Sequence, residues 1–235
     1  NTSLLNNARR IALRNRIIKE RLAEGSFSGV DKKGNDEYNG IVEKGKRLDI
    51  VIGLPAAGKS SAIVNPLSQF YKSAVIDSDI IKGRLPEFND GLGAGLVHEE
   101  SSQMNIRLLV EMLSTKNNIV LPVVGGKVSS VLEYINQAKE KGYNVHLHLN
   151  ELSDNKAMGR MLKRFFSTGR YIDVYYMKAL GNKPTQVFEQ LKNRSDIDGY
   201  SRWNNDVEYG QRPRATDFSA SEQIFARSLR ESGGN

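Results

Sequence analysis

The sequence of 235 residues predicts an α/β fold, in which a parallel sheet is flanked by helices and preceded by an N-terminal helical extension. From Arg47 onward, short apolar runs alternate with longer helical patterns, as they do in parallel sheets with crossover helices. A glycine-rich loop separates the first apolar run from the first of these helices. The chain has no cysteine, which excludes disulfides and thiolate metal sites.

The elements can be justified in order along the chain. Residues 3–24 have apolar side chains at roughly helical spacing and predict an amphipathic helix with a basic outer face. Residues 25–46 are rich in glycine and charge and predict a linker. We therefore divide the chain into residues 1–46, a basic helix with its linker, and residues 47–235, the α/β domain. Strands are expected at 48–53, 73–77, 118–123 and 144–149, and helices at 59–70, 96–115, 128–142 and 152–167.

The C-terminal part has weaker signals. Pro184 opens a helical pattern, as proline often does in a first turn. From Ala215 the chain has few apolar anchors and ends in Ser-Gly-Gly-Asn, so we expect the last residues to be disordered.

Charge and hydropathy exclude some classes of function. The net charge is +7, and residues 1–24, with six basic and two acidic side chains, hold +4 of it. The rest of the chain therefore lacks the basic stripe of a nucleic-acid-binding domain. No apolar run approaches the ~18 residues of a membrane helix, and no signal peptide opens the chain. Because residue 1 is Asn, we expect a processed form or part of a longer chain.

Residues 53–60, Gly-Leu-Pro-Ala-Ala-Gly-Lys-Ser, match the phosphate-binding pattern G-x-x-x-x-G-K-[ST] in full. The glycines allow a tight turn, so that successive N–H groups and the start of the next helix face one phosphate. Lys59 would reach the β- and γ-phosphates of a nucleoside triphosphate, and the Ser60 hydroxyl would bind Mg²⁺. The predicted nucleotide-binding residues are Gly53, Pro55, Ala56, Ala57, Gly58, Lys59, Ser60 and Ser61.

Two carboxylates follow the second predicted strand. Asp77 and Asp79 lie at its C-terminal end, on the rim where ligands of parallel sheets bind. One could accept a proton from an attacking hydroxyl, and either could join Ser60 at Mg²⁺, because no strand ends in an acidic residue in the Walker B manner. The alternative is that Asp79 caps a helix that starts near Ile80. The base-recognition motif N-K-x-D of GTPases does not occur, which argues against a GTPase switch.

These motifs, with a later arginine cluster, resemble the zeta-toxin family of P-loop kinases from about Leu48 to Asn205. In that family a D-x-D turn supplies the catalytic base, and Asp77-Ser-Asp79-Ile-Ile-Lys82 matches it here. The resemblance implies that Asp79 is the base, with Asp77 and Lys82 beside the substrate. It also implies a P-loop kinase-like fold and ATP and Mg²⁺ as cofactors.

A basic cluster occupies residues 156–170. Arg160 and Arg164 are four apart, so a helix would place them on one face. Planar guanidinium groups suit bidentate contact with phosphate, whereas the alternative is a solvated helix face; the P-loop favours phosphate binding. The resemblance implies that Arg164 and Arg170 are lid arginines that bind the triphosphate, and Arg160 is a further substrate-binding candidate.

The acceptor side departs from the family pattern. Zeta toxins that phosphorylate UDP-N-acetylglucosamine have an acidic residue after the third strand, but residues 121–127, Leu-Pro-Val-Val-Gly-Gly-Lys, hold no carboxylate. Glu99 or Glu100, in a family-like Val-His-Glu-Glu-Ser-Ser run, could replace it or could merely favour a helix start. The resemblance implies a UDP-amino sugar as acceptor, although some relatives phosphorylate nicotinamide dinucleotides.

Other features have simpler interpretations. The second His of a zinc H-E-x-x-H motif is missing after His98, and His146 and His148 share one strand face, where ordinary hydrogen bonds are expected. Helix 3–24 is expected to pack its apolar face on the domain. One alternative is contact with an acidic antitoxin-like inhibitor. Another is binding to a membrane surface, although the apolar face of this helix lacks the Trp or Phe anchors of such helices.

The sequence therefore predicts a cytoplasmic, Mg²⁺- and ATP-dependent kinase that phosphorylates a hydroxyl of a nucleotide-linked small molecule. An antitoxin or inhibitor is the candidate protein partner, and neither nucleic acid nor membrane is expected. A non-catalytic nucleotide-binding module is the alternative from another class. Replacement of Asp79 by Asn would separate them, because an enzyme would lose turnover while it still binds ATP.

Overall fold

The computed structural model describes residues 7–23, 41–91, 93–168, 173–208 and 211–232. These residues form a six-stranded sheet with the order β2-β3-β1-β4-β5-β6. Five strands are parallel, and β6 pairs with β5 in the antiparallel sense. The strands are β1 (Arg47–Ile52), β2 (Ala74–Val75), β3 (Ile119–Val123), β4 (Asn144–Glu151), β5 (Gly199–Asn204) and β6 (Arg214–Phe218).

Helices cover both faces of the sheet. The helical elements are α2 (Ala8–Ala23), the π-helix η1 (Ser60–Val64), α3 (Asn65–Tyr71), α4 (Ser78–Lys82), the 3-10 helix η2 (Pro86–Gly91), α5 (His98–Ser114), α6 (Val128–Glu140), α7 (Asp154–Thr168), α8 (Val174–Leu180), α9 (Lys183–Leu191), the 3-10 helix η3 (Ala220–Glu222) and α10 (Gln223–Glu231). One hydrophobic cluster, with Trp203 and Phe225, joins α3 and α10 to the sheet. A second, with Ile135 and Phe188, lies under α6 and α9.

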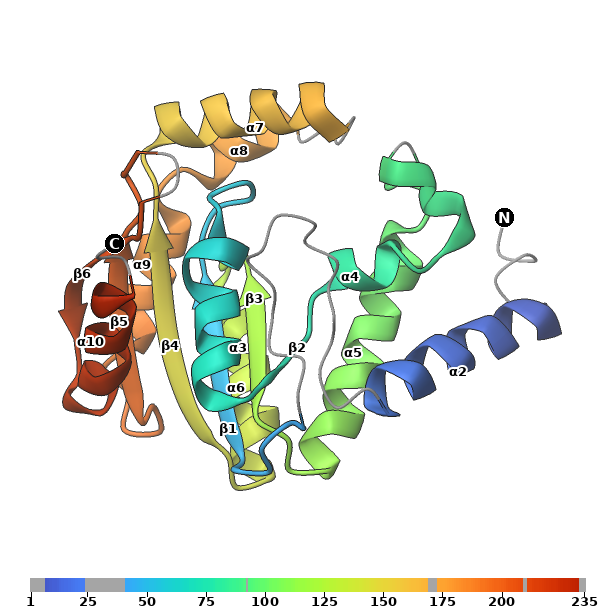
Figure 1. Ribbon diagram of the computed structural model, residues 1–235, viewed down its shortest axis with the longest axis horizontal. Coiled ribbons are helices and arrows are strands. Elements are labelled where there is room, and N and C mark those ends of the chain that lie inside the picture. Colours follow the sequence, from blue (N-terminus) through green and yellow to red (C-terminus); the bar gives the residue numbers. More distant parts are fainter. Residues whose placement is uncertain (1–6, 24–40, 92, 169–172, 209–210, 233–235) are drawn as a thin grey trace.

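The ends of the parallel strands determine where a ligand can bind. α7 crosses the carboxyl end of the sheet, above the loop that follows β1 (Figure 1). The central strands β1 and β4 are largely buried because both faces of the sheet are covered, and residues 50–52 have no exposed surface. Within the described residues, no helix is long and apolar enough to cross a membrane.

The α/β architecture predicted from the sequence is confirmed. Each of the four predicted strands and four predicted helices has a counterpart, and the helix expected at 59–70 forms as η1 followed by α3. The helix expected from Pro184 is α9. Before the last residues, for which disorder was expected, α10 extends to Glu231 and buries Phe225 and Leu229. Residues 233–235 lie outside the described residues.

The N-terminal helix packs on the domain, as expected from its apolar face. Ile17 and Ile18 are buried, and α2 lies against α5 (Figure 1). The expected basic outer face is only partly correct. Arg10 points inward to Glu100, and Arg21 is fully buried and donates to the Val75 carbonyl at 3.0 Å. The expected linker falls mostly on residues 24–40, which lie outside the described residues.

Candidate active site

The glycine-rich loop follows β1 at the carboxyl edge of the sheet. Gly58 has a φ of +73°, a left-handed conformation that suits glycine. Three side chains donate hydrogen bonds to the Ala57 carbonyl: Asn205 Nδ2 at 2.8 Å, Asn150 Nδ2 at 3.0 Å and Arg160 Nη1 at 3.3 Å. Because this carbonyl is held by three donors, the peptide between Ala57 and Gly58 has a fixed orientation.

The lysine and serine of the loop lie where the phosphate-binding pattern requires them. Lys59 Nζ donates to the carbonyls of Gly53 at 2.6 Å and Leu54 at 3.0 Å, so the ammonium group lies over the loop. Ser60 is exposed and is the first residue of η1. A cation and a hydroxyl at the start of a helix are suited to bind a phosphate chain and its metal ion.

The two aspartates after β2 have different roles. Asp77 is the N-cap of α4, and its Oδ1 accepts from the Asp79 amide at 2.9 Å. The cap is therefore Asp77 rather than Asp79, and the helix starts at Ser78. The Asp79 side chain is 38% exposed, and its Oδ1 lies 3.2 Å from Nζ of the buried Lys82. Lys82 thus fixes the Asp79 carboxylate and leaves it accessible.

One cavity of about 490 Å³ gathers most of the predicted site. Its lining comes from the phosphate loop, the start of α4, the segment that leads into α5, the end of β3 and one residue of α8. The predicted residues that line it are Pro55, Ala56, Ala57, Gly58, Lys59, Ser60, Asp77, Asp79 and Lys82. Gly53 and Ser61 belong to the same loop but do not line the cavity.

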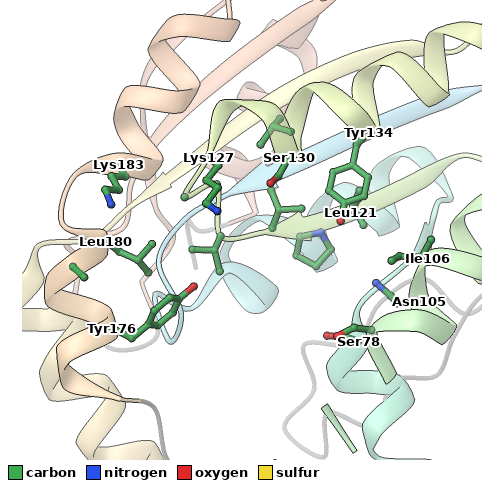
Figure 2. Close-up of a pocket in the computed structure, with 18 residues that line it drawn as sticks. Ser78, Asn105, Ile106, Leu121, Lys127, Ser130, Tyr134, Tyr176, Leu180 and Lys183 are labelled. Carbon is green, nitrogen blue, oxygen red and sulfur yellow. The ribbon is translucent and has the colours of Figure 1, made fainter. Parts of the chain in front are cut away.

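A second cavity of about 560 Å³ adjoins the first, and both are lined by Ser78, residues 122–124 and Tyr176. Figure 2 shows Lys127 and Lys183 on the side of Tyr176, and Ser78 opposite them. Among the described residues that line this cavity, none is acidic. It therefore suits a small molecule that carries negative charge, placed beside the phosphate loop.

The two glutamates at the start of α5 line neither cavity. The Glu100 side chain is 3% exposed and is bound by Arg10 Nη2 at 2.6 Å and Arg14 Nε at 2.8 Å. Glu99 is exposed and accepts from Gln103 at 3.4 Å. Because α2 occupies Glu100 and neither glutamate lines a cavity, the structure gives no support to the suggestion that one of them supplies the missing acceptor carboxylate.

The basic cluster is divided in the structure. Arg160 contacts the phosphate loop through Ala57 and also donates to the Asn205 carbonyl at 3.2 Å, so it braces the loop from α7. Arg164 belongs to α7, but its side chain lies outside the described residues, as does Arg170 entirely.

Sequence reasoning missed four residues of the site. Asn150 and Asn205 hold the phosphate loop, and Lys127 and Lys183 line the second cavity. Asn205 lies at the end of the part of the chain that resembles the family, but no role had been predicted for it. The other three gave no signal, because a single Asn or Lys at a strand or helix end is common.

A family model described as Zeta toxin matches residues 35–212, which is most of the chain. The chain belongs to the zeta toxin family. This finding confirms the resemblance carried by the phosphate loop and the D-x-D turn. As a member of this family of P-loop kinases, the protein is a phosphotransferase.

Solved structures agree with this membership at the level of the fold. A chain of the PezAT chromosomal toxin–antitoxin system of Streptococcus pneumoniae is similar with a TM-score of 0.65 and 13% identity, over 94% of this chain and 93% of that chain. A chain of the AvrRxo1-ORF1:-ORF2 complex with ATP is similar with a TM-score of 0.63 and 16% identity, over 96% and 72%. No curated protein matches this chain.

Proposed function

We propose that this zeta toxin transfers the γ-phosphoryl group of ATP to a hydroxyl of a nucleotide-linked small molecule. The observation that carries the proposal is the arrangement of Lys59, Ser60 and Asp79 around one cavity, next to a second cavity whose described lining contains two lysines and no acidic residue. ATP as the donor is supported by the similar AvrRxo1 complex, which was solved with ATP.

The donor phosphates would lie against the backbone amides of residues 55–60, with Lys59 at the β- and γ-phosphates. Mg²⁺ fits the same cavity, because the Ser60 hydroxyl and the Asp77 and Asp79 carboxylates line it and oxygen atoms are the ligands that Mg²⁺ prefers. When bound, the ion neutralises charge on the phosphates.

Asp79 is the proposed general base. Its carboxylate would accept the proton of the acceptor hydroxyl, whose oxygen forms a bond to the γ-phosphorus while the bond to the β–γ bridging oxygen breaks and ADP leaves. Lys82 orients this carboxylate through the contact at 3.2 Å. We also propose that Arg164 and Arg170 bind the moving phosphoryl group, since α7 crosses the carboxyl end of the sheet (Figure 1).

The first acceptor to consider is a UDP-amino sugar such as UDP-N-acetylglucosamine. Lys127 and Lys183 could bind its diphosphate, since both line the second cavity. A nicotinamide dinucleotide, which also carries a diphosphate, is the second candidate. The nicotinamide dinucleotide is favoured because the described lining of this cavity has no acidic side chain, whereas family members that bind the amino sugar contact it through a carboxylate.

Mass spectrometry of small molecules tests this proposal. The protein is incubated with ATP, Mg²⁺ and each acceptor in turn, with a Lys59→Ala variant as the control. We expect one acceptor to gain the mass of one phosphoryl group with wild-type protein and none with the variant. ATP binding without transfer to any nucleotide-linked acceptor would instead support a non-catalytic nucleotide-binding module.

An inhibitory protein partner is part of the proposal. It is supported by similarity to a chain from a toxin–antitoxin system. If a protein that is purified together with this chain is such an inhibitor, it should lower the phosphoryl-transfer rate. An unchanged rate would show that this protein does not inhibit the kinase.

A further inference from the structure

A groove at the far edge of the sheet is lined by arginines and belongs to neither cavity of the kinase site. It encloses about 700 Å³ between α10 and residues 211–215, which lead into β6. Figure 1 shows β6 and α10 at the opposite edge of the sheet from α4 and α5. The groove shares no lining residue with the two kinase cavities. From Pro213 on, its residues also lie beyond the segment that the family model matches.

Four arginines line this groove: Arg212, Arg214, Arg227 and Arg230. The part of its lining that the structure describes contains no acidic side chain. On α10, Arg227 and Arg230 are exposed and, with Gln223, recur at intervals of four and three residues. This spacing places them on one helix face, toward the groove.

These arginines differ from most others in the chain. Arg10, Arg47, Arg194 and Arg202 each contact at least one carboxylate at 3.0 Å or less. By contrast, none of the four groove arginines makes an ion pair or a side-chain hydrogen bond in the part of the chain that the structure describes. Four like charges side by side repel one another, and a bound polyanion would relieve this repulsion.

The size and the remaining lining narrow the chemistry of that anion. Guanidinium groups bind phosphate oxygens in a bidentate manner. A diphosphate or triphosphate brings several negative charges to one short segment, which matches four guanidinium groups better than a single carboxylate does. The groove also has room for an organic part, and Pro213, Ala226 and the 41% exposed Phe218 offer apolar surface for it.

We propose that this arginine groove is a second anion site, which binds the polyphosphate of a nucleoside di- or triphosphate separately from the phosphate loop. The guanidinium groups of Arg227 and Arg230 bind the phosphates from α10, and those of Arg212 and Arg214 bind them from the opposite wall. The Phe218 ring lies along the base or sugar.

The stoichiometry of ADP binding, measured by isothermal titration calorimetry, tests the proposal. Wild-type protein is expected to bind two ADP molecules per chain. The double variant Arg227→Gln/Arg230→Gln is expected to weaken the affinity for one of these ADP molecules by about tenfold or more, because each charge-assisted hydrogen bond to phosphate contributes substantially to the binding free energy. This variant should keep the phosphoryl-transfer rate. Lys59→Ala should weaken the binding of the other ADP molecule, at the phosphate loop, and should leave ADP binding in the groove unchanged.

A matched variant controls for net charge. Lys44→Gln/Lys141→Gln removes two exposed positive charges outside the groove and should retain both ADP sites. Thermal melts confirm that each variant folds, as expected for exposed positions. The proposal is overturned if wild-type protein binds one ADP, if Arg227→Gln/Arg230→Gln still binds two with unchanged affinity, or if the groove binds a single-stranded oligonucleotide and not ADP. If Lys59→Ala alone leaves ADP binding unchanged, this result contradicts the proposed kinase site and does not contradict the groove.

Discussion

At the residue scale, the D-x-D turn shows how two identical side chains acquire different roles. Asp77 accepts a hydrogen bond from the Asp79 amide and caps α4, whereas Asp79 points its carboxylate into the cavity next to Lys82. The backbone conformation, extended at Asp77 and helical afterwards, decides which carboxylate is engaged by the main chain. The sequence located the pair, and the family resemblance pointed to Asp79 as the base, but the residues alone did not show that Asp77 is the helix cap.

Replacement of Asp77 by Ala should therefore lower both stability and turnover. Loss of an N-cap costs about 1 kcal/mol, and a frayed first turn would displace Asp79 from the acceptor. Asp77→Asn is the matched control, because Asn caps helices as well as Asp does. We expect denaturant unfolding to show wild-type stability for Asp77→Asn and reduced stability for Asp77→Ala. Equal stability of the two variants would contradict the capping role.

At the element scale, α2 is joined to the kinase domain by buried charge as well as by apolar packing. Arg10 and Arg14 both bind the Glu100 carboxylate, and Arg10 also reaches Glu87 at 2.7 Å. The hydrogen bond to Glu100 raises the pKa of Arg10 above its ordinary value. The amphipathic pattern predicted that α2 packs on the domain. It did not reveal the ion pairs, because their partner lies some 90 residues away in sequence.

Glu100→Gln should loosen this attachment. The substitution leaves two largely buried arginines without their carboxylate, which is expected to lower the free energy of unfolding by about 2 kcal/mol or more. Glu99→Gln is the control on the same turn, since its exposed side chain should change stability by less than about 0.5 kcal/mol. Urea denaturation of both variants provides the measurement. Similar values for the two would show that α2 is held by its apolar face alone.

At the scale of the whole molecule, a buried polar network joins the sheet to the C-terminal helix. Arg47 binds both Asp49 and Glu222, while His148 Nε2 contacts Asp49 at 2.7 Å and His146 contacts Glu222. Burial would raise the pKa of Asp49, but Arg47 and the hydrogen bond with His148 outweigh it and hold the pKa well below its usual range. The pKa of Glu222 is likewise lowered, against the effect of burial, by the His146 hydrogen bond and by His148 and Arg47.

Acid should therefore unfold the protein through this network. A carboxylate whose pKa is lower in the folded state stabilises the fold above its unfolded pKa, which is about 4 for Asp and Glu, and loses that contribution as the pH falls further. We expect the free energy of unfolding to fall steeply below about pH 4. Glu222→Gln should make this decline shallower. If the free energy of unfolding of the variant falls as steeply with pH as that of wild type, groups other than Glu222 cause the acid sensitivity.

The sequence predicted the parallel sheet and the phosphate loop because both depend on local patterns, the apolar runs of buried strands and the spacing of Gly53, Gly58, Lys59 and Ser60. It missed β5, whose partly buried Tyr200 and Arg202 interrupt the apolar pattern, and α10, whose few apolar residues are buried by contact with α3 and the sheet. Lys183 joins Lys127 in the second cavity only through the folded arrangement of α9 and the β3–α6 loop. Contacts of this kind depend on topology, which a single sequence does not provide.

The most direct test of the account is phosphoryl transfer by Asp79→Asn, measured together with ATP binding. If Asp79 is the general base beside the phosphate loop, transfer to the acceptor should fall by about 100-fold or more, while calorimetry shows ATP binding close to that of wild type. Transfer at the wild-type rate, with ATP still bound, would contradict the assignment of this carboxylate and the mechanism built on it.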